Sequence, residues 1–340
     1  MQAGISVLVC SFNGSRRLPE TLAHLAKQEC PEGLQWEVII IDNASTDQTA
    51  EVAKTEWQKR EVVNAGFRVL HEKSAGKIHA LHKGIEHAKF DRFIICDDDN
   101  WLLPNYVATA FYLLQLHPEV GAAGGRGIGV AESGKLPDWF PAYGKDYAIG
   151  PQDDEGISGD ITRRRGYLWG AGMVSRTALF KKMYEDFPFL LTGRKNAALI
   201  GGEDAEYCLR LVLSNYRLWY DENLVFKHFM PAQRLELSYR DQLVETLETD
   251  RIILDKYYLA VKMKFKCEGR PLNRLRLMLM TPLRFLLAGR KSKAVTEKWK
   301  LRFLYPFEER KDPVMFAIKL FMRRNSQAKP DYFLKSNTLI

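Results

Sequence analysis

An alternation of short apolar runs with stretches of helical spacing, over the first 125 residues, constrains this chain more than any other feature. The apolar runs are nearly continuous, which is typical of strands that are buried on both faces of a sheet. We expect strands at residues 4–13, 36–42, 66–72 and 90–98, and helices at 15–28, 44–57, 76–89 and 103–118. Strands and helices that alternate with short links predict an α/β fold, with a mostly parallel sheet and helices on both of its faces.

The alternation stops near residue 126, and glycine, proline and aromatic residues dominate up to about residue 165. Long connections of this kind are usually functional, so we expect a loop that packs or binds a ligand. A further strand is expected at 224–231, and beyond residue 239 the chain is helical and increasingly basic. We therefore predict a main α/β domain over residues 1–238 and a basic helical C-terminal region over residues 239–340.

The net charge of +8 is unevenly distributed along the chain. Residues 251–340 hold 22 Lys and Arg against 7 Asp and Glu, a net charge of +15, whereas the first 250 residues carry −7. Within the basic end, residues 270–293 interleave arginine with leucine and methionine, which predicts a helix that lies on an anionic membrane surface. The alternative is a helix packed on the main domain with its arginines solvated. Nucleic acid is the weaker partner, because no recognised binding motif accompanies the charge.

The five cysteines are scattered and form no CxxC pair, which favours free thiols in a reducing compartment. The N-terminal residues have neither the basic start nor the long apolar stretch of a signal peptide. No apolar run reaches the roughly 18 residues of a membrane-spanning helix. We expect a cytoplasmic protein, at the inner face of the cell membrane if the basic end binds lipid.

Polar residues stand at the predicted strand ends, namely Asn13, Asp42 and the adjacent Asp97, Asp98 and Asp99. In α/β sheets, ligands bind at the carboxyl ends of the strands. Three adjacent carboxylates near a core repel one another, and a divalent cation or a phosphate ligand that brings one would compensate them. A solvated acidic turn is the local alternative. The spacing of the first and third aspartates suits a Mg²⁺ or Mn²⁺ site.

Familiar glycine-rich phosphate loops are absent from the sequence. There is no GxxxxGK[ST] stretch, and GGRGIG at 124–129 is not GxGxxG and does not follow the first strand. A metal held by carboxylates is another way to hold phosphate, because Mg²⁺ and Mn²⁺ bind through one or two carboxylates plus substrate phosphates.

Four stretches in order, VLVCSFNG, VIIIDNASTDQTAEV, IICDDDNWLLP and GGEDAEYCLRL, resemble the family 2 glycosyltransferases of the GT-A fold. The resemblance extends over about residues 4–230. It implies a GT-A-like catalytic domain and an inverting, metal-dependent transfer of a sugar from a nucleotide-diphosphate sugar, with UDP as the expected nucleotide. The implied acceptor is a hydroxyl of a glycan or lipid-linked glycan, for surface polysaccharide or glycoconjugate synthesis.

The resemblance implies a donor site built from residues of the first three stretches. Cys10 and Phe12 stand where the family lines the base, and Asp42 where an acid recognises it, with Asn43 in place of a second aspartate. Lys77 stands where the family often approaches the diphosphate. Asn13 and Asp98 are counted with these nucleotide-sugar-binding residues.

The resemblance also implies the metal ligands and the base. Asp97 and Asp99 match the DxD pair, in which the first meets the ribose or sugar and the last binds the metal, and Asn100 replaces a fourth acid. Asp204 matches the catalytic base, and His228 a histidine that completes metal binding in some relatives. Mn²⁺ or Mg²⁺ is the expected cofactor.

Three further residues are candidates for contact with the acceptor or the sugar. Trp101 and Trp169 could stack on sugar rings, with core packing as the alternative. Glu203 could contact the acceptor, or it could be an ordinary acid in the first turn of a helix, as could Asp204. His228, between apolar residues, could equally be a packed histidine.

The implied chemistry needs a base for the acceptor hydroxyl and positive charge for the leaving diphosphate. One base on the face opposite the leaving group gives inversion. We expect the helix N-terminus to lower the pKa of Asp204 and keep it ionised. The other functions that remain open are a nucleotidyltransferase, a glycoside hydrolase, and a non-catalytic glycan-binding protein on a transferase fold.

Overall fold

The computed structural model describes residues 1–62, 64–185, 187–191, 201–267 and 312–325. The strands are β1 (Gln2–Ser11), β2 (Trp36–Asn43), β3 (Gly66–Glu72), β4 (Phe90–Asp97), β5 (Asn100–Leu102), β6 (Val120–Ala131), β7 (Gly159–Asp160), β8 (Val174–Arg176) and β9 (Arg217–Met230). The helices are α1 (Leu18–Ala26), α2 (Thr49–Gln58), α3 (Lys77–His87), α4 (Tyr106–Leu116), α5 (Phe140–Tyr143), α6 (Thr177–Tyr184), α7 (Glu203–Leu213), α8 (Leu237–Cys267) and α11 (Pro313–Asn325), with short 3₁₀ helices η1 (Gly144–Tyr147) and η2 (Ala232–Leu235).

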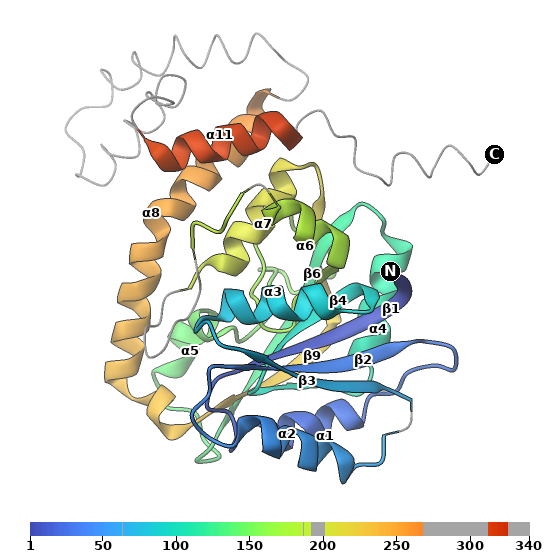
Figure 1. Ribbon diagram of the computed structural model, residues 1–340. Helices are drawn as coiled ribbons and strands as arrows, with labels where there is room; N and C mark the ends of the chain where they lie inside the picture. The colour runs from blue at the N-terminus through green and yellow to red at the C-terminus, as the bar shows by residue number, and fades with distance from the viewer. Residues whose placement is uncertain (63, 186, 192–200, 268–311, 326–340) are drawn as a thin grey trace.

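A single sheet runs through the molecule in the order β3-β2-β1-β4-β8-β6-β9-β5, with β7 paired to β9. Strands β1 to β4 are parallel to one another, as predicted, while β8 runs antiparallel between β4 and β6. The described pairings divide equally between parallel and antiparallel, so the sheet is mixed. The predicted α/β class is confirmed, with helices on both faces of the sheet (Figure 1).

The alternation of side chains along the buried strands explains how both faces are covered. In β1, Val7 and Val9 join one apolar cluster, whereas Leu8 joins the other. Helices α1 and α2 complete the first cluster and α3 the second, so they lie on opposite sides of the parallel strands (Figure 1). Continuous apolar runs therefore predicted the strands correctly, because successive residues point to opposite faces and both faces are buried.

The register of the parallel strands brings the predicted polar residues to one edge. The last residue of β1, Ser11, lies beside Asp42 of β2, and Cys10 lies beside Asp97 of β4. The carboxyl ends of β1, β2 and β4 thus meet, as in other α/β sheets with a ligand crevice.

The expectation of a loop from residue 126 was wrong for its first part. Strand β6 continues to Ala131 alongside β9. A Cβ at Gly125 would lie 1.7 Å from the carbonyl oxygen of Leu224, and one at Gly127 would lie 2.1 Å from that of Ala148. These glycines therefore permit the close approach of neighbouring backbone and are compatible with a strand.

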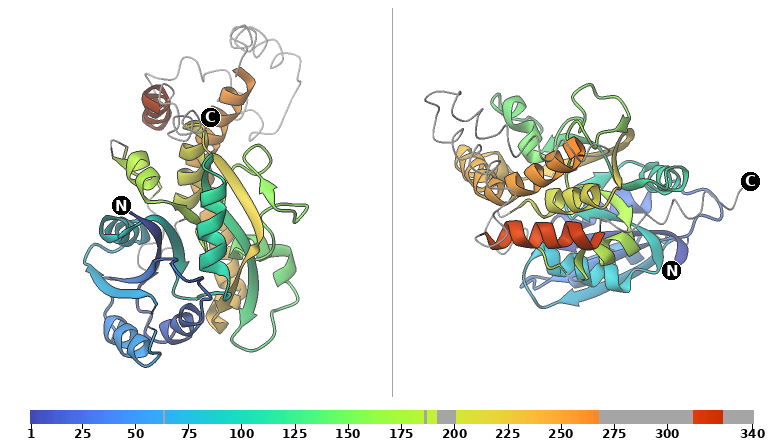
Figure 2. Two further views of the ribbon diagram at one scale, coloured as in Figure 1. Left: turned by 90° about the vertical axis from the view of Figure 1, so that its right-hand side faces the viewer. Right: turned by 90° about the horizontal axis from the view of Figure 1, so that it is seen from above.

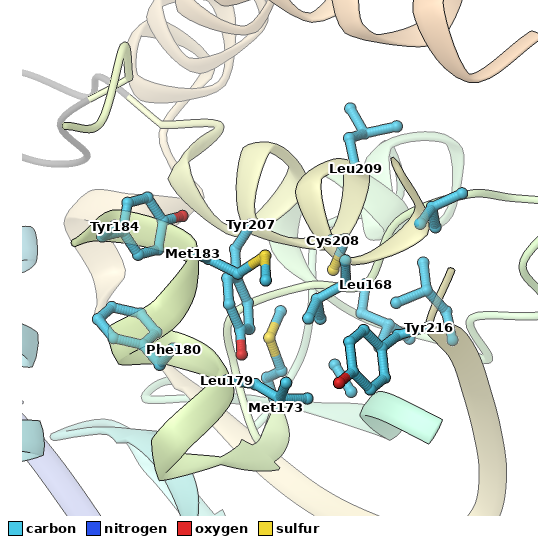
Figure 3. Packing of buried hydrophobic residues seen from close by; sticks show 14 of the residues in the cluster. Leu168, Met173, Leu179, Phe180, Met183, Tyr184, Tyr207, Cys208, Leu209 and Tyr216 are labelled. Atoms are coloured by element: carbon cyan, nitrogen blue, oxygen red, sulfur yellow. The ribbon is translucent and has the colours of Figure 1, made fainter. Parts of the chain in front are cut away.

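A second core region lies beneath α6 and α7. Phe180 and Tyr184 from α6 and Tyr207 from α7 gather there, with Cys208 nearby (Figure 3). The hydroxyl groups of Ser175 and Tyr207 are hydrogen bonded to each other at 2.7 Å. This packing fixes the start of α7, which carries the predicted base.

The C-terminal helices pack against this same core. Tyr257 of α8 and Phe321 of α11 are buried in the cluster that also contains Leu8 of β1. Helix α8 runs along one side of the molecule, and α11 crosses it at one end (Figures 1 and 2). The predicted boundary at residues 238 and 239 falls just inside α8. The membrane-binding segment predicted at 270–293 lies outside the described residues. No described helix combines the length and the hydropathy needed to cross a bilayer.

Candidate active site

Each of the three adjacent aspartates is paired with its own cationic side chain. Lys77 Nζ lies 2.6 Å from Asp97 Oδ1. Arg17 donates to both oxygens of Asp98, at 2.8 and 2.9 Å, and Arg234 Nη1 donates to Asp99 Oδ2 at 2.6 Å. The repulsion that the sequence poses is therefore compensated by lysine and arginine from three separate parts of the chain. These three pairs are called the aspartate–cation pairs below.

The three pairs point in different directions because of the geometry of the strand end. Asp97 and Asp98 are consecutive, so their side chains point to opposite faces of the sheet. Asp97 meets Lys77 of α3, whereas Asp98 meets Arg17, at the start of α1, and Ser11. Burial raises the pKa of the Asp98 carboxyl above its ordinary value although Arg17 opposes this. Asp98, predicted to bind the nucleotide sugar, is thus oriented toward α1 and does not join Lys77.

Asp99 lies beside His228, the other predicted metal ligand. His228 Nε2 lies 3.4 Å from Asp99 Oδ1, and its Nδ1 lies 2.9 Å from the carbonyl oxygen of Tyr147. In the neutral imidazole, the ring nitrogen beside a carbonyl oxygen carries the proton, which leaves the lone pair on Nε2. That lone pair faces Arg234 Nη1 at 3.2 Å. One arginine nitrogen therefore contacts both predicted metal ligands.

The chemistry of this donor set suits a divalent cation. A carboxylate oxygen and a neutral imidazole nitrogen 3.4 Å apart can both approach one cation to about 2.1 Å. The bond from Nδ1 to Tyr147 is the backbone contact that commonly orients a metal-ligating histidine. Among the described residues, no three His, Cys, Asp or Glu side chains cluster closely enough to hold a cation alone. A cation here would need further oxygens from phosphate or water.

Lys77 and Asp204 both lie close to Gly170. A Cβ placed at Gly170 would lie 3.4 Å from the Cβ of Asp204 and 3.7 Å from Lys77 Nζ. The backbone N–H of Gly170 donates to Asp204 Oδ2 at 2.7 Å. A pocket between α3 and α7 is lined by Lys77, Gly170, Glu203 and Asp204, among others. The predicted base and the predicted diphosphate-binding lysine therefore share one pocket.

The expectation for the ionisation of Asp204 was wrong in direction. Burial raises the pKa of its carboxyl above the ordinary value. The backbone N–H groups of Gly170 and Ala205 and the charge of Lys77 oppose this, but they do not outweigh desolvation. A carboxylate at a helix start is stabilised by the dipole only as far as it remains hydrated. A raised pKa makes Asp204 a stronger proton acceptor.

The ammonium group of Lys77 stays protonated. Burial opposes the charged form, but Asp97 and Glu203 raise the pKa of Lys77 above its ordinary value. Glu203 thus contributes to the field in the pocket. A protonated lysine at the first residue of α3, beside the strand ends, is suited to contact a phosphate.

The residues predicted to line the base lie at the ends of β1 and β2. Phe12 is 40% exposed, and burial raises the pKa of the Cys10 thiol to about 12, so this thiol stays neutral. Asp42 Oδ2 lies 3.1 Å from His71 Nδ1 of β3. Asn13 accepts a hydrogen bond from the backbone N–H of Thr46 at 2.8 Å, so its side chain connects the loops that follow β1 and β2.

Two asparagines occupy positions where the family pattern has acids. The side-chain amide of each both accepts and donates a hydrogen bond. Asn43 Oδ1 accepts from the N–H of Gly76 at 2.8 Å, while Nδ2 donates to the carbonyl of Ser74 at 2.7 Å. Asn100 Oδ1 accepts from the N–H of Asp97 at 3.2 Å, while Nδ2 donates to Asp99 Oδ1 at 3.1 Å. An ionised carboxylate has no donor for either second bond. These departures from the pattern therefore fit local hydrogen bonding.

The two tryptophans do not share one environment. Trp101 is stacked with His24 and with Phe229, whose ring centroids lie 5.2 and 5.3 Å away. Trp169 is buried, and the guanidinium of Arg165 lies 4.6 Å from its ring centre. Neither tryptophan is among the residues that line the pocket between α3 and α7.

Sequence reasoning missed Arg17, Arg234 and Gly170. Arg234 is 135 residues from Asp99 along the chain, and no local pattern connects the two. Arg17 was visible as a basic residue after the first strand, but its partner on β4 depends on the pairing of strands. Gly170 carries no side chain, so only the close approach of α3 and α7 reveals its role.

The arrangement of the sheet and its strand-end aspartates defines an α/β protein of the GT-A type. Solved structures of that type align along nearly the whole chain. S. aureus TarS 1–349 in complex with UDP-GlcNAc aligns with a TM-score of 0.51 and 15% identity, covering 95% of this chain and 89% of that one. The mannosyltransferase PcManGT from Pyrobaculum calidifontis, in complex with GDP-Man and Mn²⁺, gives 0.52 and 15%, covering 96% and 88%. This similarity concerns the fold.

The family follows from the sequence match. Residues 6–168 match the family model of glycosyl transferase family 2, so this segment is a domain of that family. Poly-beta-1,6-N-acetyl-D-glucosamine synthase of Staphylococcus epidermidis is 32% identical over 126 residues, which cover 36% of this chain and 28% of the relative. A dolichyl N-acetyl-alpha-D-glucosaminyl phosphate 3-beta-D-2,3-diacetamido-2,3-dideoxy-beta-D-glucuronosyltransferase of Methanococcus voltae is 22% identical over 235 residues, 66% of each chain. The chain thus spans only part of the length of these relatives.

Proposed function

We propose that this protein is an inverting, metal-dependent glycosyltransferase. It moves a sugar from a nucleotide-diphosphate sugar, with UDP as the nucleotide, to a hydroxyl of a glycan or lipid-linked glycan in polysaccharide or glycoconjugate synthesis. The observation that carries the proposal is the pocket in which Lys77 and Asp204 both approach Gly170, beside the aspartates at the end of β4. The match of residues 6–168 to the family model of glycosyl transferase family 2 supports the reaction class.

The proton transfer is assigned to Asp204. Its backbone bonds to Gly170 and Ala205 orient the carboxylate, and its raised pKa favours acceptance of the acceptor's hydroxyl proton. As the proton leaves, the hydroxyl oxygen bonds to the anomeric carbon and the bond to the diphosphate breaks. Attack from the side opposite the leaving group inverts the anomeric configuration.

We assign the binding of the leaving diphosphate to Lys77. The ammonium group stabilises negative charge that develops on the leaving oxygen. Asp97 holds the lysine in place at 2.6 Å, so the cation needs little reorganisation during the reaction. Asp99 and His228 would hold a divalent cation, which supplies further positive charge to the diphosphate when bound.

Donor and acceptor are proposed from the neighbours. TarS in its complex holds UDP-GlcNAc, whereas PcManGT holds GDP-Man with Mn²⁺, so the fold accommodates both nucleotides. We infer UDP from the position of Asp42 at the end of β2. The polysaccharide and lipid-linked products in the names of the two relatives support a glycan acceptor.

A donor screen tests the proposal. The full chain is incubated with UDP- and GDP-linked sugars, with Mn²⁺ or Mg²⁺ and with EDTA, and released nucleotide is measured by chromatography. We expect release of UDP that requires metal, and an inverted anomer by NMR when an acceptor is found. Release of pyrophosphate from a nucleoside triphosphate and a sugar phosphate would instead identify a nucleotidyltransferase. Binding of glycan without turnover of any donor would identify a non-catalytic protein.

A further inference from the structure

Arg234 occupies the point where the two predicted metal ligands converge. Its Nη1 lies 2.6 Å from Asp99 Oδ2 and 3.2 Å from His228 Nε2. In the neutral tautomer that the contact between His228 Nδ1 and the Tyr147 carbonyl favours, the lone pair on His228 Nε2 points toward Arg234 Nη1. A cation bound between Asp99 Oδ1 and His228 Nε2 would need the Nε2 lone pair that faces Arg234, and it would stand beside the guanidinium, which donates to the other oxygen of Asp99.

The surroundings hold Arg234 in this place. Its side chain is 13% exposed, and Nε donates to the hydroxyl of Tyr239 at 3.2 Å. The backbone of η2 is fixed as well, because the Tyr147 hydroxyl donates to the carbonyl of Arg234 at 3.1 Å. Although burial opposes its charge, Asp99 raises the pKa of Arg234 above the ordinary value, so it is always a cation.

We propose that the guanidinium of Arg234 and a divalent cation are alternative occupants of the position between Asp99 and His228. Arg234 keeps the buried carboxylate paired while metal is absent, and its side chain leaves when metal binds. The inference rests on the metal dependence proposed above and extends it to a residue that the sequence did not single out.

The two other aspartate–cation pairs do not share this property. Lys77 meets Asp97 without contacting a second metal-ligand candidate, and Arg17 meets Asp98 on the other face of the sheet. Only Arg234, of these three cations, contacts both Asp99 and His228. Competition with metal is therefore a property of this one pair.

Mn²⁺ binding to the full chain, without nucleotide, tests the inference. Free Mn²⁺ is measured by electron paramagnetic resonance for the parent, Arg234→Ala, Arg234→Lys and the control Arg240→Ala, whose arginine pairs with Asp241 instead. Removal of charge-assisted hydrogen bonds should tighten Mn²⁺ binding in Arg234→Ala by about 10- to 100-fold. Arg234→Lys keeps a cation and should stay near the parent, as should the control.

Thermal unfolding gives a second readout that does not depend on activity. Arg234→Ala should unfold at a lower temperature than the parent without metal, because the ion pair between Asp99 and Arg234 is lost. Mn²⁺ should raise its unfolding temperature more than that of the parent. Equal Mn²⁺ affinity in Arg234→Ala and parent would overturn the inference, and so would the absence of Mn²⁺ binding in both. In the latter case, sugar transfer that persists in EDTA would preserve the transferase assignment and remove only its metal.

Discussion

At the scale of single residues, the site depends on the polarity and charge of a few side chains. Asp204 and Lys77 have a raised pKa for opposite reasons: burial dominates for the acid, whereas nearby acids dominate over burial for the lysine. The two groups border one glycine, so a change in the charge of one is felt by the other.

Replacement of Asp204 by asparagine should separate catalysis from binding. The amide keeps the shape of the side chain but cannot accept the proton, so the transfer rate should fall by about 10²–10⁴-fold. UDP affinity, measured by calorimetry, should change little because Asp204 is assigned to the acceptor. Asp99→Asn should lose metal-assisted UDP binding along with rate. A transfer rate near that of the parent in Asp204→Asn would contradict the assignment and make Glu203 the next candidate for the base. A loss of UDP binding as severe as in Asp99→Asn would instead show that Asp204 contacts the donor.

The pH dependence of the rate should report the burial of Asp204. The base works only when deprotonated, so the rate is at its maximum above its pKa and falls as pH decreases through it. Because this pKa is raised, the fall should occur above the ordinary carboxylate range of about 4. Lys77 lowers the pKa of Asp204, so Lys77→Met should move the fall to still higher pH. A pH profile that is unchanged in Lys77→Met would show that the charge of Lys77 does not affect the group that titrates.

At the scale of elements, short segments are held in place by amide side chains. Asn43 connects the end of β2 to the segment before α3, and Asn100 connects the end of β4 to β5. Both residues are buried. The turn that presents Asp97 and Asp99 is thus fixed by Asn100, and the first residue of α3, Lys77, is fixed by Asn43.

Asn100→Asp should destabilise the turn between β4 and β5, although it restores the acid of the family pattern. The change removes the donor to Asp99 and places a further negative charge in a fully buried position. We expect a loss of at least about 1–3 kcal/mol, measured by urea unfolding. Asn105→Asp, an exposed substitution at the start of α4, is the control and should be near neutral. Equal midpoints for Asn100→Asp and parent would contradict the assigned bonds.

At the scale of the whole molecule, α8 is attached to the main domain by a buried polar cluster. Glu206 and Arg210 of α7 are 0% and 2% exposed by side chain, and they approach to 2.6 Å. The Tyr257 hydroxyl of α8 donates to Glu206 at 2.9 Å and accepts from Arg210 at 3.0 Å. Lys264 donates to the carbonyl groups at the end of α7. The region predicted to begin at residue 239 therefore contributes to the core of the preceding domain.

Truncation after Tyr239 should consequently destabilise the catalytic domain. It removes Tyr257, Phe321 and other buried side chains, each worth about 1.5–3 kcal/mol, from a fold whose total stability is about 5–15 kcal/mol. Thermal unfolding and solubility measure the effect. Truncation after Cys267, which keeps α8, should be milder. Identical unfolding temperatures for the parent and the chain that ends at Tyr239 would show that α8 contributes nothing to the domain.

The membrane prediction for residues 270–293 is better tested by charge than by truncation. The full chain should sediment with anionic vesicles in a salt-sensitive way. Arg276→Glu combined with Arg284→Glu should weaken that sedimentation, while neutral vesicles should not retain either protein. Sedimentation that is unaffected by the double substitution would favour packing on the catalytic domain.

The sequence predicted the parallel half of the sheet and the order of its helices, because continuous apolar runs are diagnostic of strands buried on both sides. The sequence did not predict the extension of β6. The glycines of this strand are needed because the backbone of β9 and of residue 148 approaches them closely, and only the tertiary fold shows that approach. The candidate residues at the strand ends were visible for the same reason as the strands. Their partners were not, because Arg17 and Arg234 reach the aspartates through the tertiary fold alone.

The aspartate–cation pairs also bear on the order in which ligands arrive. Three acids matched by three cations leave these six side chains with no net charge, so the pairs themselves exert little long-range attraction on a lone Mn²⁺ that approaches from solution. A nucleotide diphosphate that carries its own Mn²⁺ brings both a ligand for the metal and an acceptor for a displaced arginine. The protein is therefore expected to bind Mn²⁺ more tightly in the presence of a nucleotide diphosphate than in its absence.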